Sequence, residues 1–210
     1  MNTFKTEACV GGLNQLLEAR KKGADRVELC DRLDLDGVTP PKQVILNAKA
    51  EGMVPLRVMV RPRGGNFVYT DDELQEMISS IEYCKALGVE GVVFGILKVD
   101  GSLDIDKISR LTKIAHPLKV TIHKAIDETP DPVEAVRELV KIEGITGILS
   151  SGGRNTANEG KEILKEMLEI SGDRLEIIPA VGITQCNVHD LHSFLRAKVY
   201  HGKRIVGDLL

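Results

Sequence analysis

Short aliphatic runs recur along the chain about every 25 to 30 residues, with amphipathic stretches between them. This alternation is typical of a parallel β-sheet whose strands are connected by helices. Eight such runs favour a compact (β/α)8 TIM barrel over a doubly wound open sheet, because no G-x-G-x-x-G sequence follows the first run. The predicted strands are Phe4–Val10, Arg26–Cys30, a third that begins at Leu56, Gly91–Leu97, Lys119–His123, Gly147–Ser151, Leu175–Ala180 and Lys198–His201.

The amphipathic stretches predict seven helices, and only Gly202–Leu210 follows the last strand. We therefore expect a single TIM-barrel domain over residues 1–210, with 202–210 as a short tail in place of a full final helix. A missing helix leaves apolar barrel surface bare, so we expect the tail, a partner subunit or both to cover it, and the chain to form a homo-oligomer. The predicted helices are Leu13–Lys22, one that starts near Pro40, one from about Asp71 to Leu87, Asp104–Ala115, one that ends near Ile142, Asn158–Ser171 and one that follows Thr184.

The charge balance and the N-terminal stretch narrow the functional classes. A net charge of −3 and a pI of about 6.0, with no Lys/Arg-rich block, argue against a nucleic-acid partner. No apolar signal-peptide core opens the chain, and no apolar run has membrane-spanning length. We therefore expect a cytoplasmic protein without a membrane partner, whose four cysteines are reduced. Their spacing contains no C-x-x-C pair and so gives no zinc signal.

Several predicted strands carry a polar face opposite an aliphatic one. Residues two apart in a strand share a face, so Val58 and Val60 lie on one side of the third strand while Arg57 and Arg61 lie on the other. In a barrel the aliphatic face meets the helices, so the polar face must point into the lumen, which Val, Ile and Leu usually fill. The polar face comprises Glu7, Cys9, Arg26, Glu28, Cys30, Arg57, Met59, Arg61, Thr121 and His123.

This polar lumen has two interpretations. In the first, Glu28 pairs with Arg61 and Glu7 pairs with Arg26, and the lumen is a self-satisfied ion-pair network. In the second, the residues form a site, because buried ion pairs stabilise poorly and barrel enzymes place their chemistry at the carboxyl ends of the strands. The candidate catalytic residues are then Glu28, Arg61, His123 and Asp127.

Two stretches are candidates for binding an anion. Arg61 and Arg63 place two guanidinium groups around Pro62, which ends the third strand, and guanidinium groups bind carboxylate or phosphate bidentately. Ser151, Gly152 and Gly153 follow the sixth strand, where small residues leave backbone N–H groups free near a helix start. The alternative for this second stretch is a plain glycine turn with a capping serine.

Sulfur atoms on the lumen face indicate a possible metal site. Cys9 and Cys30 fall on neighbouring predicted strands, with Met59 on the next strand along. Soft sulfur ligands select Cu(I), so these three residues are the candidate ligands, although a free cysteine is more often a small buried hydrophobe. We expect Cys84 to be such a core residue and Cys186 to be more exposed. His201 would lie at the end of the last strand, whereas His116, His189 and His192 are predicted to lie on the surface.

Six stretches carry a resemblance to a known family: Glu7–Val10, Gly23–Cys30, Gly37–Pro40, Arg61–Tyr69, Gly91–Gly95 and Ile122–Asp127. In these stretches the chain resembles the CutC family of copper homeostasis proteins, and the match covers nearly its whole length to about His201. The resemblance implies a TIM barrel, a cytoplasmic location and a role in copper handling. The sequence departs from the family pattern at Asn66, where the family has aspartate, at Lys124, where it has arginine, and at Pro179–Gly182, where it is richer in glycine.

Two functions follow as expectations. The first is a cytosolic copper homeostasis protein that binds Cu(I) through Cys9, Cys30 and Met59. The second is an enzyme of unassigned reaction that acts on a small anionic substrate, carboxylate or phosphate, at the barrel mouth.

Overall fold

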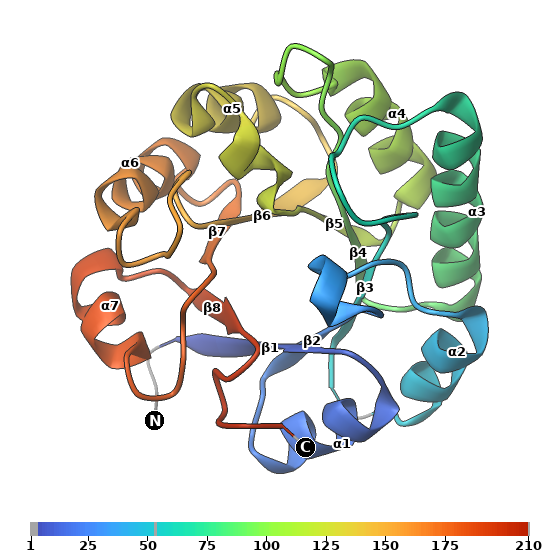
Figure 1. Cartoon of the computed structure of the whole chain (residues 1–210), viewed down its shortest axis with the longest axis horizontal. Coiled ribbons are helices and arrows are strands. Elements are labelled where there is room, and N and C mark those ends of the chain that lie inside the picture. The colour runs from blue at the N-terminus through green and yellow to red at the C-terminus, as the bar shows by residue number, and fades with distance from the viewer. Residues whose placement is uncertain (1–3, 53, 210) are drawn as a thin grey trace.

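Eight parallel strands form a barrel in the computed structural model, which describes residues 4–52 and 54–209 (Figure 1). Each strand is short and nearly all of its residues are buried, as expected for parallel strands that are covered on both faces. The strands are β1 (Lys5–Val10), β2 (Arg26–Leu29), β3 (Leu56–Met59), β4 (Gly91–Phe94), β5 (Lys119–Ile122), β6 (Ile145–Ser150), β7 (Glu176–Pro179) and β8 (Val199–Gly202).

The strand order confirms the predicted TIM barrel and excludes the doubly wound sheet. Neighbours in sequence pair from β1 to β7, and β8 returns to pair with β1. Among the described residues, β7 and β8 lie side by side without a hydrogen-bonded ladder. A single bridge between Thr184 and Arg204 joins the segments just beyond them.

Seven α-helices in the described part of the chain surround the barrel (Figure 1). Their ends follow local sequence signals. The longest helix begins with a capping box between Thr70 and Glu73 and ends at Gly88 in the left-handed conformation, and Asp131 caps the fifth helix ahead of Pro132. The helices are α1 (Leu13–Lys21), α2 (Lys42–Ala50), α3 (Asp71–Leu87), α4 (Ile105–Ala115), α5 (Pro132–Leu139), α6 (Lys161–Ser171) and α7 (Val188–Leu195).

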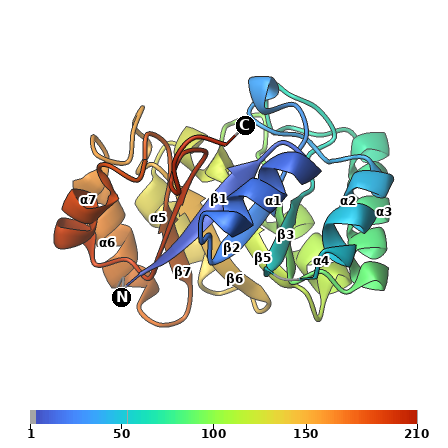
Figure 2. The ribbon, with the colours of Figure 1, turned by 90° about the horizontal axis from the view of Figure 1, so that it is seen from below.

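The segment after β8 forms no eighth helix within the described residues. Ile205 is buried, Val206 and Leu209 pack against the core, and the Lys22 ammonium donates to the Asp208 carbonyl. The tail therefore runs from β8 toward α1, and the side view in Figure 2 places the C-terminal end beside the carboxyl ends of the strands. No helix in the described residues combines the length and the apolar character needed to span a bilayer.

The predicted boundaries differ from the structure at a few places, mostly at the ends of elements. β3 ends at Met59 because Arg61 and the residues after it turn into a loop, and α6 begins at Lys161 rather than at Asn158. Two short 3-10 helices were not anticipated, η1 (Leu33–Leu35) and η2 (Lys124–Glu128).

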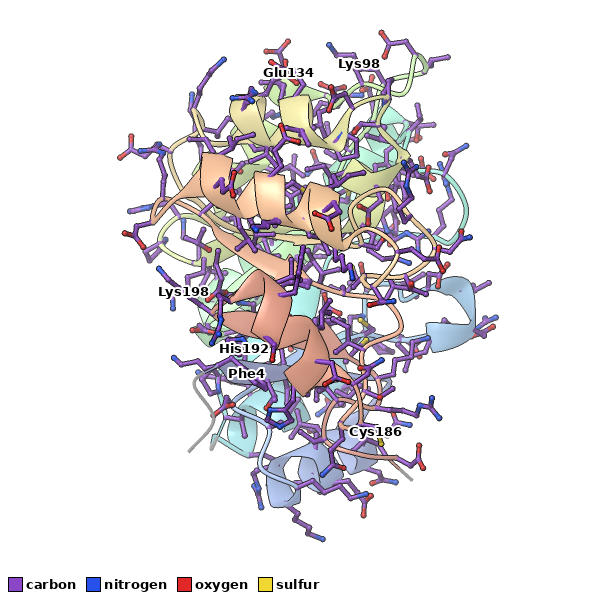
Figure 3. The ribbon with its side chains drawn as sticks, turned by 90° about the vertical axis from the view of Figure 1, so that its left-hand side faces the viewer. Phe4, Lys98, Glu134, Cys186, His192 and Lys198 are labelled. Atoms are coloured by element: carbon purple, nitrogen blue, oxygen red, sulfur yellow. The ribbon has the colours of Figure 1, made fainter. Side chains whose placement is uncertain are left out.

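The side chains on the outer face follow the sequence prediction with one correction. Cys84 is fully buried, and Cys186, His116 and His189 are exposed, as predicted. His192 is half-buried and not a plain surface residue, because its ring packs against Phe4 and its Nδ1 lies 3.1 Å from the Tyr200 hydroxyl (Figure 3).

Candidate metal and ligand site at the barrel mouth

The parity of the strands places the polar residues inside the barrel, as the sequence predicts. Glu7, Glu28 and Arg57 are almost completely buried, while Ala8, Val27 and Val58 on the opposite parity pack into the aliphatic layer under the helices. The polar lumen has two levels along the barrel axis. The lower level is an ion-pair network, and the upper level opens into a cavity.

The lower level is held together by carboxylate–guanidinium pairs that cross the lumen. Glu7 accepts a hydrogen bond from Arg26, which confirms the predicted pair, and Arg26 also contacts Glu176 on β7 at 2.9 Å. Arg57 donates to the Thr121 hydroxyl at 2.5 Å and lies 3.9 Å from Glu176. These pairs satisfy buried charges that would otherwise be costly.

Glu7 also joins this network to the level above. Its carboxylate contacts His201 Nδ1 at 2.9 Å, and His201 Nε2 lies 3.6 Å from the Glu28 carboxylate. Burial would raise the pKa of Glu7, but the hydrogen bond with His201 and the charge of Arg26 lower it to about 2. Burial would lower the pKa of His201, but the carboxylates of Glu28 and Glu7 and the thiol of Cys9 raise it well above its usual value. Glu7 and His201 therefore form a buried ion pair.

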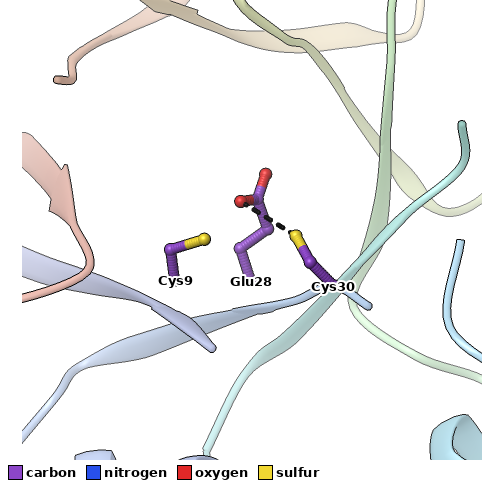
Figure 4. A group of neighbouring side chains, drawn as sticks. All are labelled: Cys9, Glu28 and Cys30. Atoms are coloured by element: carbon purple, nitrogen blue, oxygen red, sulfur yellow. Dashed lines mark hydrogen bonds between the residues drawn. The ribbon is translucent and has the colours of Figure 1, made fainter. Parts of the chain in front are cut away.

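Above this pair, β1 and β2 bring two thiols and a carboxylate together (Figure 4). One ligand atom each from Cys9, Glu28 and Cys30 lie within 4.8 Å of one another, and Cys30 Sγ lies 3.6 Å from the Glu28 carboxylate. Met59 and Leu33 pack against the two cysteines. The structure thus brings together the three predicted sulfur ligands. It also places Glu28 beside them, and Leu33 of η1 packs against them.

The two thiols differ in acidity because Cys30 acts as a hydrogen-bond donor to Cys9. A hydrogen bond from Cys30 outweighs burial and lowers the pKa of Cys9 well below its usual value. That same bond, together with burial, raises the pKa of Cys30. Burial raises the pKa of Glu28 to about 8, against the opposing charge of His201. The group therefore combines an acidic thiol with neutral donors, and soft metal ions bind thiolates of this kind.

A cavity of about 880 Å³ opens above this group, which is within the range of small-molecule sites. Cys9, Glu28, Met59 and His201 line it on the side of β1, β2, β3 and β8. On the side of β5 and β6 the lining residues include His123, Lys124, Asp127, Ser151 and Arg154.

Arg61 lies at this cavity, but its partners are not those that we expected. Its guanidinium donates to the backbone carbonyls of Leu35, Gly37 and Gly65 at 2.7 to 2.9 Å and stacks on Phe67 at 4.8 Å. It does not form the predicted pair with Glu28. These carbonyls belong to two loops, so Arg61 fixes the loop that carries η1, and only its Nε remains without a partner.

Arg63 points away from the cavity and stabilises its own loop. It pairs with Glu73 at 2.5 Å and donates to the carbonyls of Asn66 and Val68. The predicted fork of Arg61 and Arg63 is therefore not assembled at the mouth, because both groups bind carbonyl or carboxylate oxygens of the chain.

The second predicted anion site is filled by a carboxylate of the chain itself. Asp127 accepts hydrogen bonds from the Ser150 hydroxyl at 2.5 Å, from Ser151 N and Oγ at 2.9 and 3.1 Å, and from Gly153 N at 2.8 Å. Gly152 N donates instead to the Ser150 hydroxyl. The stretch does bind an anionic group, but that group is Asp127, whose oxygens are thereby taken up.

His123 is buried between Gly95 and Phe67. A Cβ at position 95 would lie 2.7 Å from the ring, so only glycine leaves room for it. His123 Nδ1 accepts from Ala125 N at 3.1 Å, so the proton of the neutral ring lies on Nε2, which is buried without a partner. Burial and the charge of Arg61 lower the pKa of His123 to about 3, so the ring is neutral.

Most residues of the site can be predicted from the sequence, but their contacts cannot. The sequence places His201 only at the end of the last strand, and the predicted site includes neither Glu176 nor Leu33. Glu176 shares strand parity with Ile178 and Ala180, and that alternation was the available signal. Leu33 lies in an irregular loop, for which no periodic signal exists.

Comparisons with known proteins agree with this architecture. The model of the CutC family matches residues 4–205. A CutC family protein of Mesorhizobium japonicum is 41% identical over 185 residues, which cover 88% of this chain and 71% of the relative. A human protein named copper homeostasis protein cutC homolog is 36% identical over 200 residues, 95% of this chain and 73% of the relative.

A solved structure extends the likeness to three dimensions. The CutC structure from Streptococcus agalactiae superimposes with a TM-score of 0.91 at 34% identity, and the match covers 96% of this chain and 99% of that one. The family model, the relatives and this structure together show that the chain belongs to the CutC family.

Proposed function

We propose that the chain is a cytosolic copper homeostasis protein that binds Cu(I) through the thiols of Cys9 and Cys30. One observation carries this proposal: two buried sulfur atoms and a carboxylate oxygen lie within 4.8 Å of one another, beside a cavity. The names of the human and Streptococcus agalactiae relatives, which refer to copper homeostasis, support it.

The donor set suits Cu(I) better than harder ions. Thiolate and thioether ligands select Cu(I), whereas carboxylate and carbonyl oxygens suit Mg²⁺ or Ca²⁺. Cys9 and Cys30 would supply two thiolates, and Met59, packed against them, would supply a thioether. Because Cu(I) binds thiolates, binding of the ion would release the remaining thiol protons.

An anaerobic titration of the purified chain with Cu(I), in competition with a chromogenic Cu(I) chelator, tests this site. Cys9→Ser and Cys30→Ser should each lose the tight site, and Met59→Leu should weaken it less. Cys186→Ser, which alters an exposed thiol that does not line the cavity, is the matched control and should bind like the wild type. Unchanged stoichiometry and affinity in both Cys9→Ser and Cys30→Ser would end the proposal.

A second candidate, an enzyme acting on a small anionic substrate, is favoured by His123. Its Nε2 is a buried donor without a partner, and such a group costs free energy unless something accepts its proton. In this proposal His123 would donate to a substrate oxygen, and Glu28, with its raised pKa, would act as a general acid near neutral pH. Arg61 and Asp127 would hold the loops around the site.

Thermal shift assays with succinate and inorganic phosphate as probes test this candidate. Either anion should stabilise the wild type more than His123→Asn. If both proteins respond equally to both anions, the candidate loses its support.

A further inference from the structure

The cavity is far larger than a single metal ion requires. Its volume of about 880 Å³ falls in the range of sites for organic molecules, yet the sulfur group occupies only one side of it. The other side is formed by the segments after β5 and β6. These strands lie across the barrel from β1 and β2, which carry the cysteines (Figure 1).

The side of the cavity facing the sulfur group presents cations without partners. The side chains of Lys124 and Arg154 line the cavity, and neither makes a hydrogen bond or an ion pair with any residue that the structure describes. Of the carboxylates nearby, Asp127 is taken up by Ser150, Ser151 and Gly153.

Other polar groups of the cavity lining add to these two cations. His123 lies on the same side of the cavity as Lys124 and Arg154, and its buried Nε2 has no hydrogen-bond acceptor. Two further cations, Lys203 and Arg204, line the mouth next to β8, and the exposed Asp36 and Glu128 are the remaining acidic groups of the lining.

We propose that the cavity receives Cu(I) as a complex with a small anionic thiol, whose acidic group is bound by Lys124 and Arg154 while the metal reaches Cys9 and Cys30. This inference rests on the proposed copper site and names the form in which the ion arrives. Cu(I) prefers thiolate ligands, so in a reducing compartment it is carried by thiols rather than as a free ion.

The transfer is a ligand exchange without a redox step. Bonds form between Cu(I) and the sulfur atoms of Cys9 and Cys30, while the two bonds between Cu(I) and the carrier thiolates break. Each proton that a protein thiol gives up passes to a departing carrier thiolate, and a carrier thiolate that receives no proton leaves as the anion, so charge and protons balance and copper stays in the +1 state. The cations hold the carrier during the exchange and are not ligands of the metal.

Rates of copper transfer from carriers of opposite charge test the proposal. Anaerobic stopped-flow mixing compares Cu(I)–glutathione, an anionic complex, with Cu(I)–cysteamine, whose carrier bears an ammonium group. At low ionic strength each close charge pair in water changes the rate by roughly fivefold, so attraction by two cations should speed transfer from the glutathione complex by roughly 25-fold relative to a neutral carrier. Repulsion should slow transfer from the cysteamine complex, so the wild type should favour glutathione by more than this factor. Added salt should reduce this preference.

Charge-reversal variants locate the effect. The Lys124→Glu/Arg154→Glu variant should lose or invert the preference between the two donors. Its matched control, Arg110→Glu/Lys113→Glu, makes the same change in net charge on α4 away from the cavity and should keep it. Equal rates from both donors in the wild type, or a full preference in Lys124→Glu/Arg154→Glu, would overturn the proposal.

A measurement without copper separates this inference from the proposed function. S-methylglutathione keeps the acidic groups but has no free thiol, and its binding to the metal-free chain can be followed by calorimetry. Binding that Lys124→Glu/Arg154→Glu abolishes and Arg110→Glu/Lys113→Glu retains supports the anion subsite even if Cys9→Ser leaves copper binding unchanged. No binding to the wild type refutes the subsite, whatever the copper titration gives.

Discussion

Replacing Asp127 with alanine should destabilise the barrel by an amount that its four hydrogen bonds determine. The carboxylate accepts from the Ser150 hydroxyl, from the backbone and hydroxyl of Ser151, and from the backbone of Gly153. It therefore ties η2, which follows β5, to the loop that follows β6. Alanine removes all four acceptor contacts and leaves two backbone N–H groups to find water.

The expected loss is about 3 kcal/mol. Hydrogen bonds to charged groups contribute roughly 1.5 to 3 kcal/mol each when buried, but Asp127 is only half-buried, so about 0.8 kcal/mol for each of the four bonds is the reasonable scale. For a chain of this size a loss of 3 kcal/mol corresponds to a decrease in Tm of roughly 6 to 12 °C.

Thermal and urea unfolding of Asp127→Ala measure this loss. Asp131→Ala is the matched control, because it removes a nearby carboxylate that caps α5 through two backbone N–H groups. The loss of such a cap should cost only about 1 kcal/mol.

The vacated backbone should then bind an external anion, as the sequence of this stretch predicts. With a Kd of about 10 mM, 100 mM sulfate would restore about 1.4 kcal/mol to Asp127→Ala beyond its general effect on the wild type. If Asp127→Ala is no less stable than Asp131→Ala, and sulfate stabilises both variants equally, the proposed role of this carboxylate is wrong.

Three further predictions concern other parts of the barrel. Arg61→Lys should lose the three carbonyl contacts that fix η1, so proteolysis and amide exchange around residues 32–38 should quicken, whereas Arg63→Lys should leave that segment protected. Because the pKa of His123 is about 3 in the folded chain and about 6.5 when unfolded, its contribution to stability is present above pH 6.5 and is lost as pH falls toward 3, by about 1.4 kcal/mol per pH unit. His123→Asn should therefore unfold with a shallower pH dependence over that window, and an unchanged slope would contradict the neutral ring. Light scattering at micromolar concentration should give a mass above that of one chain, since the helical layer lacks an eighth helix in the described residues; a monomeric mass would count against the predicted homo-oligomer.

The fold and the membership of the site follow from periodic signals in the sequence. Alternation with a period of two placed Glu7, Arg26 and Glu28 in the lumen, and the same parity brought Cys9, Cys30 and Met59 to one level. Strand parity is reliable here because a strand shifted by one residue would place its polar side chains under the helices and its aliphatic side chains in the lumen.

The contacts of the arginines and of Asp127 could not be predicted in the same way. Arg61 binds carbonyls of Leu35, Gly37 and Gly65, which lie in loops whose backbone follows no period. The Asp127 contacts depend on how far two neighbouring strands extend before they turn. When a charged side chain binds backbone oxygens or N–H groups, no residue of opposite charge in the sequence marks its partner. Pairing residues by charge alone therefore predicts the wrong partner, Glu28, for Arg61.

The seam between β7 and β8 is a place where two strand edges face each other without a ladder in the described residues. Strand edges without a ladder partner can pair with other chains when they become accessible. Here Arg26 and Arg57, on the opposite wall, hold Glu176 at the start of β7 from inside the barrel. The carboxylate–guanidinium network of the lower level thus braces this seam from inside the barrel. We expect that neutralising Glu176 loosens the seam and frees a strand edge for intermolecular β-sheet growth. A residue with no part in ligand binding would then govern aggregation.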